Sequence, residues 1–382
     1  MYDVIVIGCG FSGSVVANLF AKKEKKVLLI EKRKHIAGNM YDYRDDNGFL
    51  IHKYGPHILM LNNEEVYKYL SQYCSWINVS VNLQTYIDRK YIPLPINLNS
   101  VSLLYEKKKA NLITERLINT FGMNSIVNVL DLLNNSDNVV RDFGQDMYDK
   151  VFVGYNIKMW GLTPEQIDKN VIGRSPIKIS YENKKSNSKY EVVPEKGYTH
   201  LFHNLLNDKN IEIKLNTDAR KLIKIRDQKI FFKDEKFNGI VIYTGPIDEL
   251  FDYKYGALPY RAIHFRKSIK KVENVFDSIA VTYPMNYKKT RTTEMKKITL
   301  EENKNLSVLL SEYPGSYNPI SSKYNLPSYP ILNKDSKAIF NKYFKEISKI
   351  ENFYITGRLA EFEYFNMEET ILSVFNLFKR IN

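Results

Sequence analysis

The sequence predicts an α/β protein in which both ends of the chain build one domain around a parallel sheet, with a helical insertion and an antiparallel β-sheet domain between them. Three observations lead to this prediction. The chain opens with a strand, a glycine turn, a helix and a second strand. Apolar residues then recur at helical spacing from about 111 to 161, and apolar, β-branched segments follow one another between 260 and 312.

The individual elements follow from these patterns. The first domain should open with a strand at Tyr2–Ile7, a helix at Gly8–Lys22 and a strand at Lys26–Glu31. The helical insertion is predicted from apolar residues at helical spacing, namely Leu112, Leu117, Ile118, Phe121, Ile126, Val129, Leu130 and Leu133. A helix at 199–206, strands at 211–215, 239–244 and 353–356, and a helix at 367–378 should return to the first domain. We expect the first domain at 1–80, 191–250 and 331–382, the helical insertion at 100–190, and the antiparallel sheet at 81–99 and 251–330.

The composition favours a multidomain protein of a reducing compartment. A chain of 382 residues exceeds one ordinary domain. The only two cysteines, Cys9 and Cys74, lie in unrelated contexts, which argues against a disulfide framework. The first apolar run, Val4–Ile7, is too short for a signal or membrane-spanning segment. We therefore expect a cytoplasmic protein without a membrane span.

The net charge of +13 is compatible with nucleic acid, an anionic membrane or phosphorylated small molecules as partners. The lysines are scattered, however, and no long basic stretch or nucleic-acid-binding motif occurs. The six histidines show no metal-ligand spacing. We predict neither a nucleic-acid partner nor a bound metal.

A dinucleotide-binding fingerprint occupies the first glycine turn. Gly8, Gly10 and Gly13 form G-x-G-x-x-G between a strand and a helix, and Glu31 ends the next strand. The glycines allow a tight turn and close approach to a pyrophosphate, the helix N-terminus favours negative charge, and the carboxylate accepts hydrogen bonds from ribose hydroxyls. This combination is typical of a Rossmann-like domain but does not choose between FAD and NAD. Gly38-Asn39 closely follows Glu31, as in flavoproteins, and favours FAD.

Five further motifs, in order along nearly the whole chain, resemble the UDP-galactopyranose mutases. They are Ala37-Gly38-Asn39-Met40-Tyr41-Asp42, His52-Lys53-Tyr54-Gly55-Pro56-His57, Gly154-Tyr155 with Lys158-Met159-Trp160-Gly161, Tyr243-Thr244-Gly245-Pro246-Ile247-Asp248, and Ile355-Thr356-Gly357-Arg358-Leu359. The resemblance implies an isomerase that interconverts the pyranose and furanose forms of a nucleotide-linked sugar through a covalent adduct at N5 of reduced FAD. It further implies a role in galactofuranose and polysaccharide biosynthesis, NAD(P)H as external reductant, and a homodimer.

The resemblance also assigns residues to the site. The catalytic group comprises Arg174 and Arg291, which should bridge the leaving pyrophosphate, and His57, which should lie beside the isoalloxazine. Substrate contacts are expected at Tyr155, Trp160, Arg174, Arg291, Glu312, Tyr329, Tyr364 and Asn366. Cofactor contacts are expected at Gly8, Gly10, Phe11, Ser12, Gly13, Glu31, Lys32, Gly38, Asn39, Pro56, His57, Arg358, Asn366 and Met367.

The chain departs from the family motifs at positions expected near the nucleotide and sugar. These positions are Met60, Leu61, Val151, Lys185, Ser186, Phe362, Glu363 and Asn366. Loss of hydroxyl and imidazole groups changes the selectivity of a site that reads sugar hydroxyls. UDP-galactopyranose is the first candidate substrate because it is commonest in the family, and dTDP-fucopyranose, UDP-N-acetylgalactosamine or another modified hexose are alternatives.

Two other functions compete with the mutase. A redox flavoenzyme of the amine oxidase type shares the FAD fold, and a non-catalytic nucleotide-sugar binder would retain FAD without turnover. Trp160, Arg174 and Arg291 favour the mutase.

Overall fold

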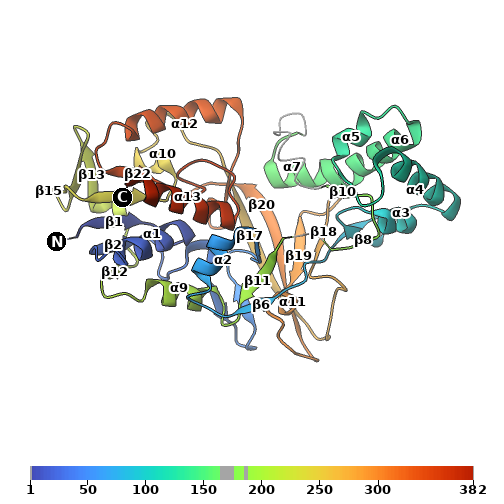
Figure 1. The fold of residues 1–382 in the computed structure, drawn as a ribbon, viewed down its shortest axis with the longest axis horizontal. Helices are drawn as coiled ribbons and strands as arrows, with labels where there is room; N and C mark the ends of the chain where they lie inside the picture. Colours follow the sequence, from blue (N-terminus) through green and yellow to red (C-terminus); the bar gives the residue numbers. More distant parts are fainter. Residues whose placement is uncertain (1, 164–175, 185–187, 382) are drawn as a thin grey trace. The chain divides into compact units, whose positions relative to one another are not determined.

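The computed structural model describes residues 2–163, 176–184 and 188–381. The chain forms two compact units (Figure 1). Unit 1 comprises Met1–Asn78, Ser188–Ala262 and Tyr317–Asn382, and unit 2 comprises Val79–Asn187 and Ile263–Ser316. No helix in the described ranges is both long and apolar enough to cross a membrane.

A five-stranded parallel sheet forms the centre of unit 1. Its order is β12-β2-β1-β16-β22, with β1 (Val4–Ile7), β2 (Val27–Ile30), β12 (Ile211–Lys214), β16 (Ile240–Tyr243) and β22 (Phe353–Ile355). Every pairing is parallel. The strands come from the N-terminal, middle and C-terminal parts of the sequence, so the prediction that both chain ends build this domain is confirmed.

Helices cover both faces of this sheet (Figure 1). One apolar core joins the sheet to α1 (Phe11–Ala21), α2 (Glu64–Leu70), α9 (Tyr198–Leu206) and α13 (Met367–Ile381). The other core contains α10 (Ile247–Leu250), α12 (Lys334–Ile347) and residues of a small sheet formed by β13 (Ile223–Arg226), β14 (Lys229–Phe232) and β15 (Glu235–Lys236). Val4 and Val6 enter the first core and Ile5 the second, because successive side chains of a strand point to opposite faces.

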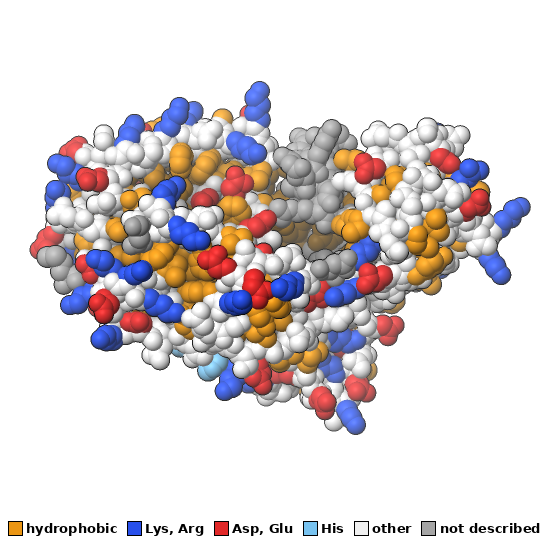
Figure 2. Space-filling view, viewed as in Figure 1, with side chains coloured by type: hydrophobic (Ala, Val, Ile, Leu, Met, Phe, Trp, Pro, Cys, Tyr) orange, Lys and Arg blue, Asp and Glu red, His pale blue; other side chains and the backbone are white. Residues whose placement is uncertain are grey.

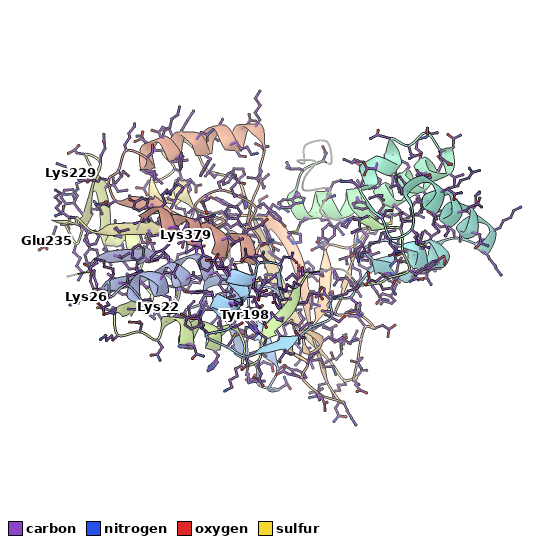
Figure 3. All side chains as sticks on the ribbon, viewed as in Figure 1. Lys22, Lys26, Tyr198, Lys229, Glu235 and Lys379 are labelled. Carbon is purple, nitrogen blue, oxygen red and sulfur yellow. The ribbon has the colours of Figure 1, made fainter. Side chains whose placement is uncertain are left out.

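Two smaller sheets complete unit 1. They are β3 (Asp42–Arg44) with β4 (Leu50–His52), and β5 (Leu59–Leu61), β11 (Tyr190–Pro194) and β6 (Trp76–Asn78) in the order β5-β11-β6. Tyr198, the first residue of α9, is fully buried. Figure 3 labels it within this unit, whereas Lys26 and Lys229 lie at the left edge of the view.

A largely antiparallel sheet forms the centre of unit 2. Its strands are β20 (Ser307–Ser316), β19 (Arg291–Glu294), β18 (Ala280–Thr282), β7 (Leu83–Ile87) and β8 (Lys90–Leu94), in that order. The pairings are antiparallel as predicted, except that β18 and β7 run parallel. Strand β17 (Tyr260–Lys270) also belongs to this sheet, and in unit 1 its first two residues pair with β21 (Tyr329–Pro330).

Most helices of unit 2 precede the sheet strands β17 to β20 in sequence, and the short α11 (Lys296–Thr299) lies between β19 and β20. The helices that precede these strands are α3 (Leu98–Leu104), α4 (Lys107–Phe121), α5 (Val129–Leu133), α6 (Asn138–Met147), the π-helical segment η2 (Tyr148–Val153) and α7 (Gly154–Trp160). The prediction that Ile126 is helical is wrong. Gly122, at φ +82°, ends α4, and Ile126 then enters a short strand, β9 (Ile126–Val127), which pairs with β10 (Ile177–Lys178). Basic side chains on the visible faces of both units are interspersed with acidic ones (Figure 2).

Candidate active site

Three segments meet at the carboxyl edge of the parallel sheet in unit 1. Gly8, Thr244 and Gly357 follow β1, β16 and β22, which are neighbours in the sheet. The hydroxyl of Thr244 donates a hydrogen bond of 2.8 Å to the carbonyl oxygen of Ile7. A Cβ atom added at Gly357 would lie 2.2 Å from Oγ of Ser12. Ligands of open α/β sheets bind outside this edge, so the three segments mark the expected cofactor position.

The two glycine turns pack directly on each other. A Cβ atom at Gly13 would lie 1.8 Å from the carbonyl oxygen of Gly8, and one at Gly38, where φ is +54°, would lie 2.8 Å from Cα of Gly10. A Cβ atom at Gly10 itself would meet nothing within 4 Å. Side chains are therefore excluded where the turns touch, while the space beside Gly10 is open to a ligand.

Helix α1 directs its N-terminus toward this loop. Gly10 is its N-cap, and no side chain caps it. The first backbone N–H groups of an α-helix lack intrahelical acceptors and favour anionic groups. The phenyl ring of Phe11 packs in the core, 4.9 Å from the ring of Phe202, so any cofactor contact of Phe11 would be through its backbone.

The carboxylate of Glu31 is fixed by backbone donors. The N–H groups of Cys9 and Arg33 donate to its two oxygens at 2.9 and 2.8 Å. The side chain is buried, and each carboxylate oxygen can accept a further hydrogen bond. This geometry suits acceptance of hydrogen bonds from ribose hydroxyls. The ammonium of the neighbouring Lys32 lies 3.7 Å from the carboxylate of Glu249.

Arg33 is a candidate cofactor contact that the sequence motifs did not single out. Its Nη2 donates a 2.9 Å hydrogen bond to Oδ1 of Asn39, and its guanidinium lies 4.6 Å from the ring centre of Tyr54. Its buried Nη1 has no hydrogen-bond partner among the described residues. A buried donor without an acceptor is costly, and a cofactor oxygen or ring nitrogen would satisfy it. In the sequence, its position two residues after Glu31 could have indicated this role.

His57 lies against the second glycine turn. Its Nε2 is 3.0 Å from the backbone oxygen of Asn39, so this nitrogen carries the proton and donates. Its backbone N–H donates to Nδ1 of His52 at 3.0 Å. Burial lowers the pKa of His52 to about 4, which keeps that ring neutral and able to accept. Pro56 precedes His57 in the loop between β4 and β5. This geometry brings His57 and Asn39 together and gives His57 a fixed orientation.

Arg358, Tyr329 and Tyr364 form a second group in unit 1. The guanidinium of Arg358 lies 4.6 Å from the ring centre of Tyr329, and the rings of Tyr329 and Tyr364 are 5.4 Å apart. Asn366 and Glu369 exchange hydrogen bonds of 2.8 and 2.7 Å between side chains and backbone N–H groups, which caps α13 at Met367. The Oδ1 atom of Asn366 is therefore engaged in the helix cap.

Arg291 and Glu312 form an ion pair in unit 2. They lie opposite each other on β19 and β20, and Nε of Arg291 donates to Oε1 of Glu312 at 2.7 Å. The side chain of Glu312 is 5% exposed and that of Arg291 is 27% exposed. A buried carboxylate thus orients a guanidinium that still reaches solvent.

Helix α7 carries Tyr155 and Trp160, and Trp160 is buried. Five residues of an α-helix rotate by about 140° beyond a full turn, so α7 does not present both rings on one face. Arg174 and Lys185, which the sequence also implicates, lie outside the described residues.

Two of the departures from the family motifs lie in the apolar cores of unit 1. Phe362 is buried in the core with its ring 5.5 Å from that of Tyr260, and Leu61 is buried beside the parallel sheet. Met60, which directly precedes Leu61 on β5, is exposed. Phe362 and Leu61 therefore have a packing role in the apolar cores. Elsewhere, no group of three or more His, Cys, Asp or Glu side chains that could hold a metal occurs among the residues described.

Comparisons with known proteins identify the family. A family model described as UDP-galactopyranose mutase matches residues 150–364, and one for NAD(P)-binding Rossmann-like domains matches residues 6–73. A dTDP-fucopyranose mutase of Escherichia coli is 32% identical over 97% of this chain and 96% of its own length. A UDP-galactopyranose mutase of Mycoplasma genitalium is also 32% identical, over 97% of this chain and 92% of its own. The chain belongs to the UDP-galactopyranose mutase family.

Membership of this mutase family makes the chain an enzyme that acts as an isomerase, as the motifs predicted. A crystal structure of reduced UDP-galactopyranose mutase superposes with a TM-score of 0.70 at 15% identity, covering 100% of this chain and 96% of that one, so the fold is shared. A flavin-containing amine oxidase A of Canis lupus familiaris is 35% identical, but over only 24% of this chain. This partial similarity supports FAD as the cofactor and gives the redox alternative no better standing than the mutase.

Proposed function

We propose that this member of the mutase family interconverts UDP-galactopyranose and its furanose form with FAD held by unit 1. The proposal that the substrate carries a diphosphate rests chiefly on the Arg291 and Glu312 pair, and UDP-galactopyranose is chosen as the commonest substrate of the family. Glu312 engages Nε of Arg291 and fixes the plane of the guanidinium, which suits two-point contact with a diphosphate. Negative charge grows on that diphosphate as it departs, so an oriented cation lowers the barrier.

The residues of unit 1 fit FAD. The space beside Gly10 and the N-terminus of α1 suit its pyrophosphate, Glu31 suits a ribose, and the unpartnered Nη1 of Arg33 supplies a donor. We propose that the cofactor contacts are Gly8, Gly10, Phe11, Ser12, Gly13, Glu31, Lys32, Arg33, Gly38, Asn39, Pro56, His57, Arg358, Asn366 and Met367. When bound and reduced, FAD supplies the nucleophilic nitrogen N5 that the reaction requires.

The chain's own residues bind and orient the reactants. His57 is oriented by its bond to the Asn39 carbonyl and should hold its face of the flavin ring rather than abstract a proton through Nε2, which already carries one. Tyr329 and Tyr364, which contact each other beside Arg358, should donate to the diphosphate of the substrate. Tyr155, Trp160, Asn366 and Arg174 complete the proposed substrate contacts.

A second substrate, dTDP-fucopyranose, has support from the name of a relative that is 32% identical over 97% of this chain. A direct assay separates the two. Dithionite-reduced protein is incubated with UDP-galactopyranose, dTDP-fucopyranose and UDP-N-acetylgalactosamine, and furanose products are resolved by chromatography. We expect the highest kcat/KM with UDP-galactopyranose. A higher value with dTDP-fucopyranose would reassign the substrate, and the absence of any furanose product would overturn the proposal.

We further propose NAD(P)H as the external reductant, a homodimer in solution and a cytoplasmic location. Anaerobic mixing with NADH or NADPH should bleach the flavin absorbance, and light scattering should give twice the 44.8 kDa mass of one chain. If only dithionite reduces the flavin, NAD(P)H is not the reductant. If light scattering gives the mass of one chain, the protein is not a homodimer. Fractionation of the source cells tests the location.

A further inference from the structure

The side chain of Lys158 crosses from α7 to the loop that joins β18 to β19. Its ammonium donates to the carbonyl oxygen of Tyr283 and lies 3.1 to 3.4 Å from those of Tyr287, Met285 and Lys289. An ammonium has three N–H donors, so four carbonyl oxygens share them. One ammonium group thus interacts with four backbone carbonyl groups of the same loop.

That loop leads directly to Arg291. Its base is closed by a 2.8 Å hydrogen bond from the N–H of Tyr283 to the carbonyl oxygen of Thr290, and the N–H of Thr290 donates to the carbonyl oxygen of Glu312 at 2.9 Å. The loop and the ion pair of Arg291 with Glu312 are therefore consecutive parts of one hydrogen-bonded segment. A shift of the loop would move the guanidinium.

A second contact joins α7 to the same loop. A Cβ atom at Gly154, the first residue of α7, would lie 2.3 Å from the carbonyl oxygen of Pro284. Only glycine permits this approach. The helix is thus fixed to the loop at Gly154 by close packing and at Lys158, one turn later, by a charged group.

Burial supports the same conclusion. Lys158 is half-buried, and this burial lowers its pKa to about 8. The carbonyl dipoles around it are the groups that compensate for the lost hydration.

We propose that Lys158 is a positioning residue that sets the loop at 283–290, and through it Arg291, against the helix that carries Tyr155 and Trp160. The inference rests on the proposed function only in giving Arg291 the diphosphate as its ligand. It concerns unit 2 alone and adds a role for a residue outside the proposed substrate contacts.

The test is a double-mutant cycle on nucleotide binding and turnover. UDP and dTDP are titrated calorimetrically against the FAD-loaded wild type, Lys158→Met, Arg291→Ala and the double variant, and kcat/KM is measured on the reduced forms. We expect Lys158→Met to weaken nucleotide binding and kcat/KM about tenfold to a hundredfold, the range of one charged hydrogen-bonded group. In the Arg291→Ala background, Lys158→Met should lower nucleotide affinity and kcat/KM less than threefold, because Lys158 acts through Arg291.

Each outcome decides between the two proposals. An equal effect of Lys158→Met in both backgrounds, or no effect in the wild type while Arg291→Ala is impaired, overturns the positioning role. No effect of Arg291→Ala on either nucleotide or on turnover overturns the proposed function and this inference together. Far-UV circular dichroism and thermal melting establish that all variants are folded.

A conservative variant keeps the proposal testable should Lys158→Met fail to fold. In the wild type, nucleotide affinity should fall as pH rises through about 8, because the neutral amine loses a donor and its charge. Lys158→Arg stays charged, so this decline should move to higher pH. The loop also carries Tyr283, whose pKa burial raises to about 12, Tyr287, and Lys289, whose pKa is lowered by burial and by Lys270. Lys289→Arg should leave the decline in nucleotide affinity near pH 8 unchanged. If the decline disappears in Lys289→Arg but persists in Lys158→Arg, Lys158 is not the titrating group.

Discussion

Nε of Arg291 lies 2.7 Å from Oε1 of Glu312, across the antiparallel pair β19 and β20. The carboxylate is nearly fully buried and the guanidinium is not, so the acid acts as a fixed support and the base as the group presented to a ligand. A buried carboxylate needs such a partner, because an unpaired charge in this position would be strongly destabilising.

Replacement of Arg291 tests this arrangement. Arg291→Ala should lower kcat/KM for the sugar nucleotide by about a hundredfold or more, as expected for loss of a donor that stabilises developing charge. FAD content, measured from the flavin absorbance, should be unchanged because the proposed cofactor contacts all lie in unit 1. Arg266→Ala is the control, since Arg266 is exposed and lies over the ring of Tyr313. A similar loss in the control would mean that any basic residue of this sheet has the same effect.

Two glycines of the first turn should respond differently to the same substitution. Gly10→Ala places a methyl group in open space at an ordinary φ of −83°, so the apoprotein should melt within a few degrees of the wild type but bind FAD at least tenfold more weakly. Gly13→Ala drives a methyl group to 1.8 Å from the Gly8 carbonyl oxygen and should destabilise the apoprotein itself. Thermal melting and flavin titration measure both. Normal FAD affinity in Gly10→Ala would place the cofactor elsewhere.

Arg33 should contribute to FAD affinity. Arg33→Met removes the buried Nη1 donor, and we expect the Kd for FAD to rise about tenfold, the scale of one hydrogen bond from a charged group. Lys34→Met, at the exposed neighbouring position, should not change it. Fluorescence titration of apoprotein with FAD gives both constants. Equal Kd values for the two variants would make the interaction of Arg33 with Asn39 and Tyr54 purely structural.

Asp248 makes stability depend on pH. Burial raises its pKa to about 6, above the unfolded value of 3.8, so the folded state holds the proton more tightly. The stabilisation that the protonated Asp248 gives the folded state is fully present below pH 3.8 and is lost as pH rises through about 6. Asp248→Asn keeps an acceptor for the N–H of Leu258 and should raise the free energy of unfolding at pH 7 by about 1 to 3 kcal/mol, with less gain at pH 4.5. Urea titrations across this range measure the difference. A constant offset at every pH would show that Asp248 is not the titrating group.

Local patterns were sufficient to predict the parallel sheet and the glycine turns. Gly13 and Gly38 are required by contacts within a short stretch or between neighbouring turns, and Gly8 by its φ of +102°. Such local requirements appear directly in the sequence. The helix at Met367 was predicted for the same reason, since its cap and apolar face are local.

Features that depend on distant parts of the chain were not predictable. The importance of Arg33 comes from the burial of one nitrogen, and that of Lys158 from carbonyl groups more than 120 residues away. The motifs that contain Phe362 and Leu61 predict positions near the substrate, and the packing of both side chains in the apolar cores depends on residues far away in the sequence. The parallel pairing of β7 with β18 joins segments almost 200 residues apart, which alternation of apolar residues cannot reveal.

The most direct test of the central claim measures furanose formation and the redox state of the flavin in the same reaction. FAD-loaded protein is incubated anaerobically with UDP-galactopyranose or dTDP-fucopyranose, once oxidised and once after reduction with dithionite, while flavin absorbance and furanose product are followed. The account predicts furanose product only from the reduced protein, over many turnovers, with no electrons consumed. Bleaching of the oxidised flavin by the sugar nucleotide, or no furanose product from either state, would contradict it.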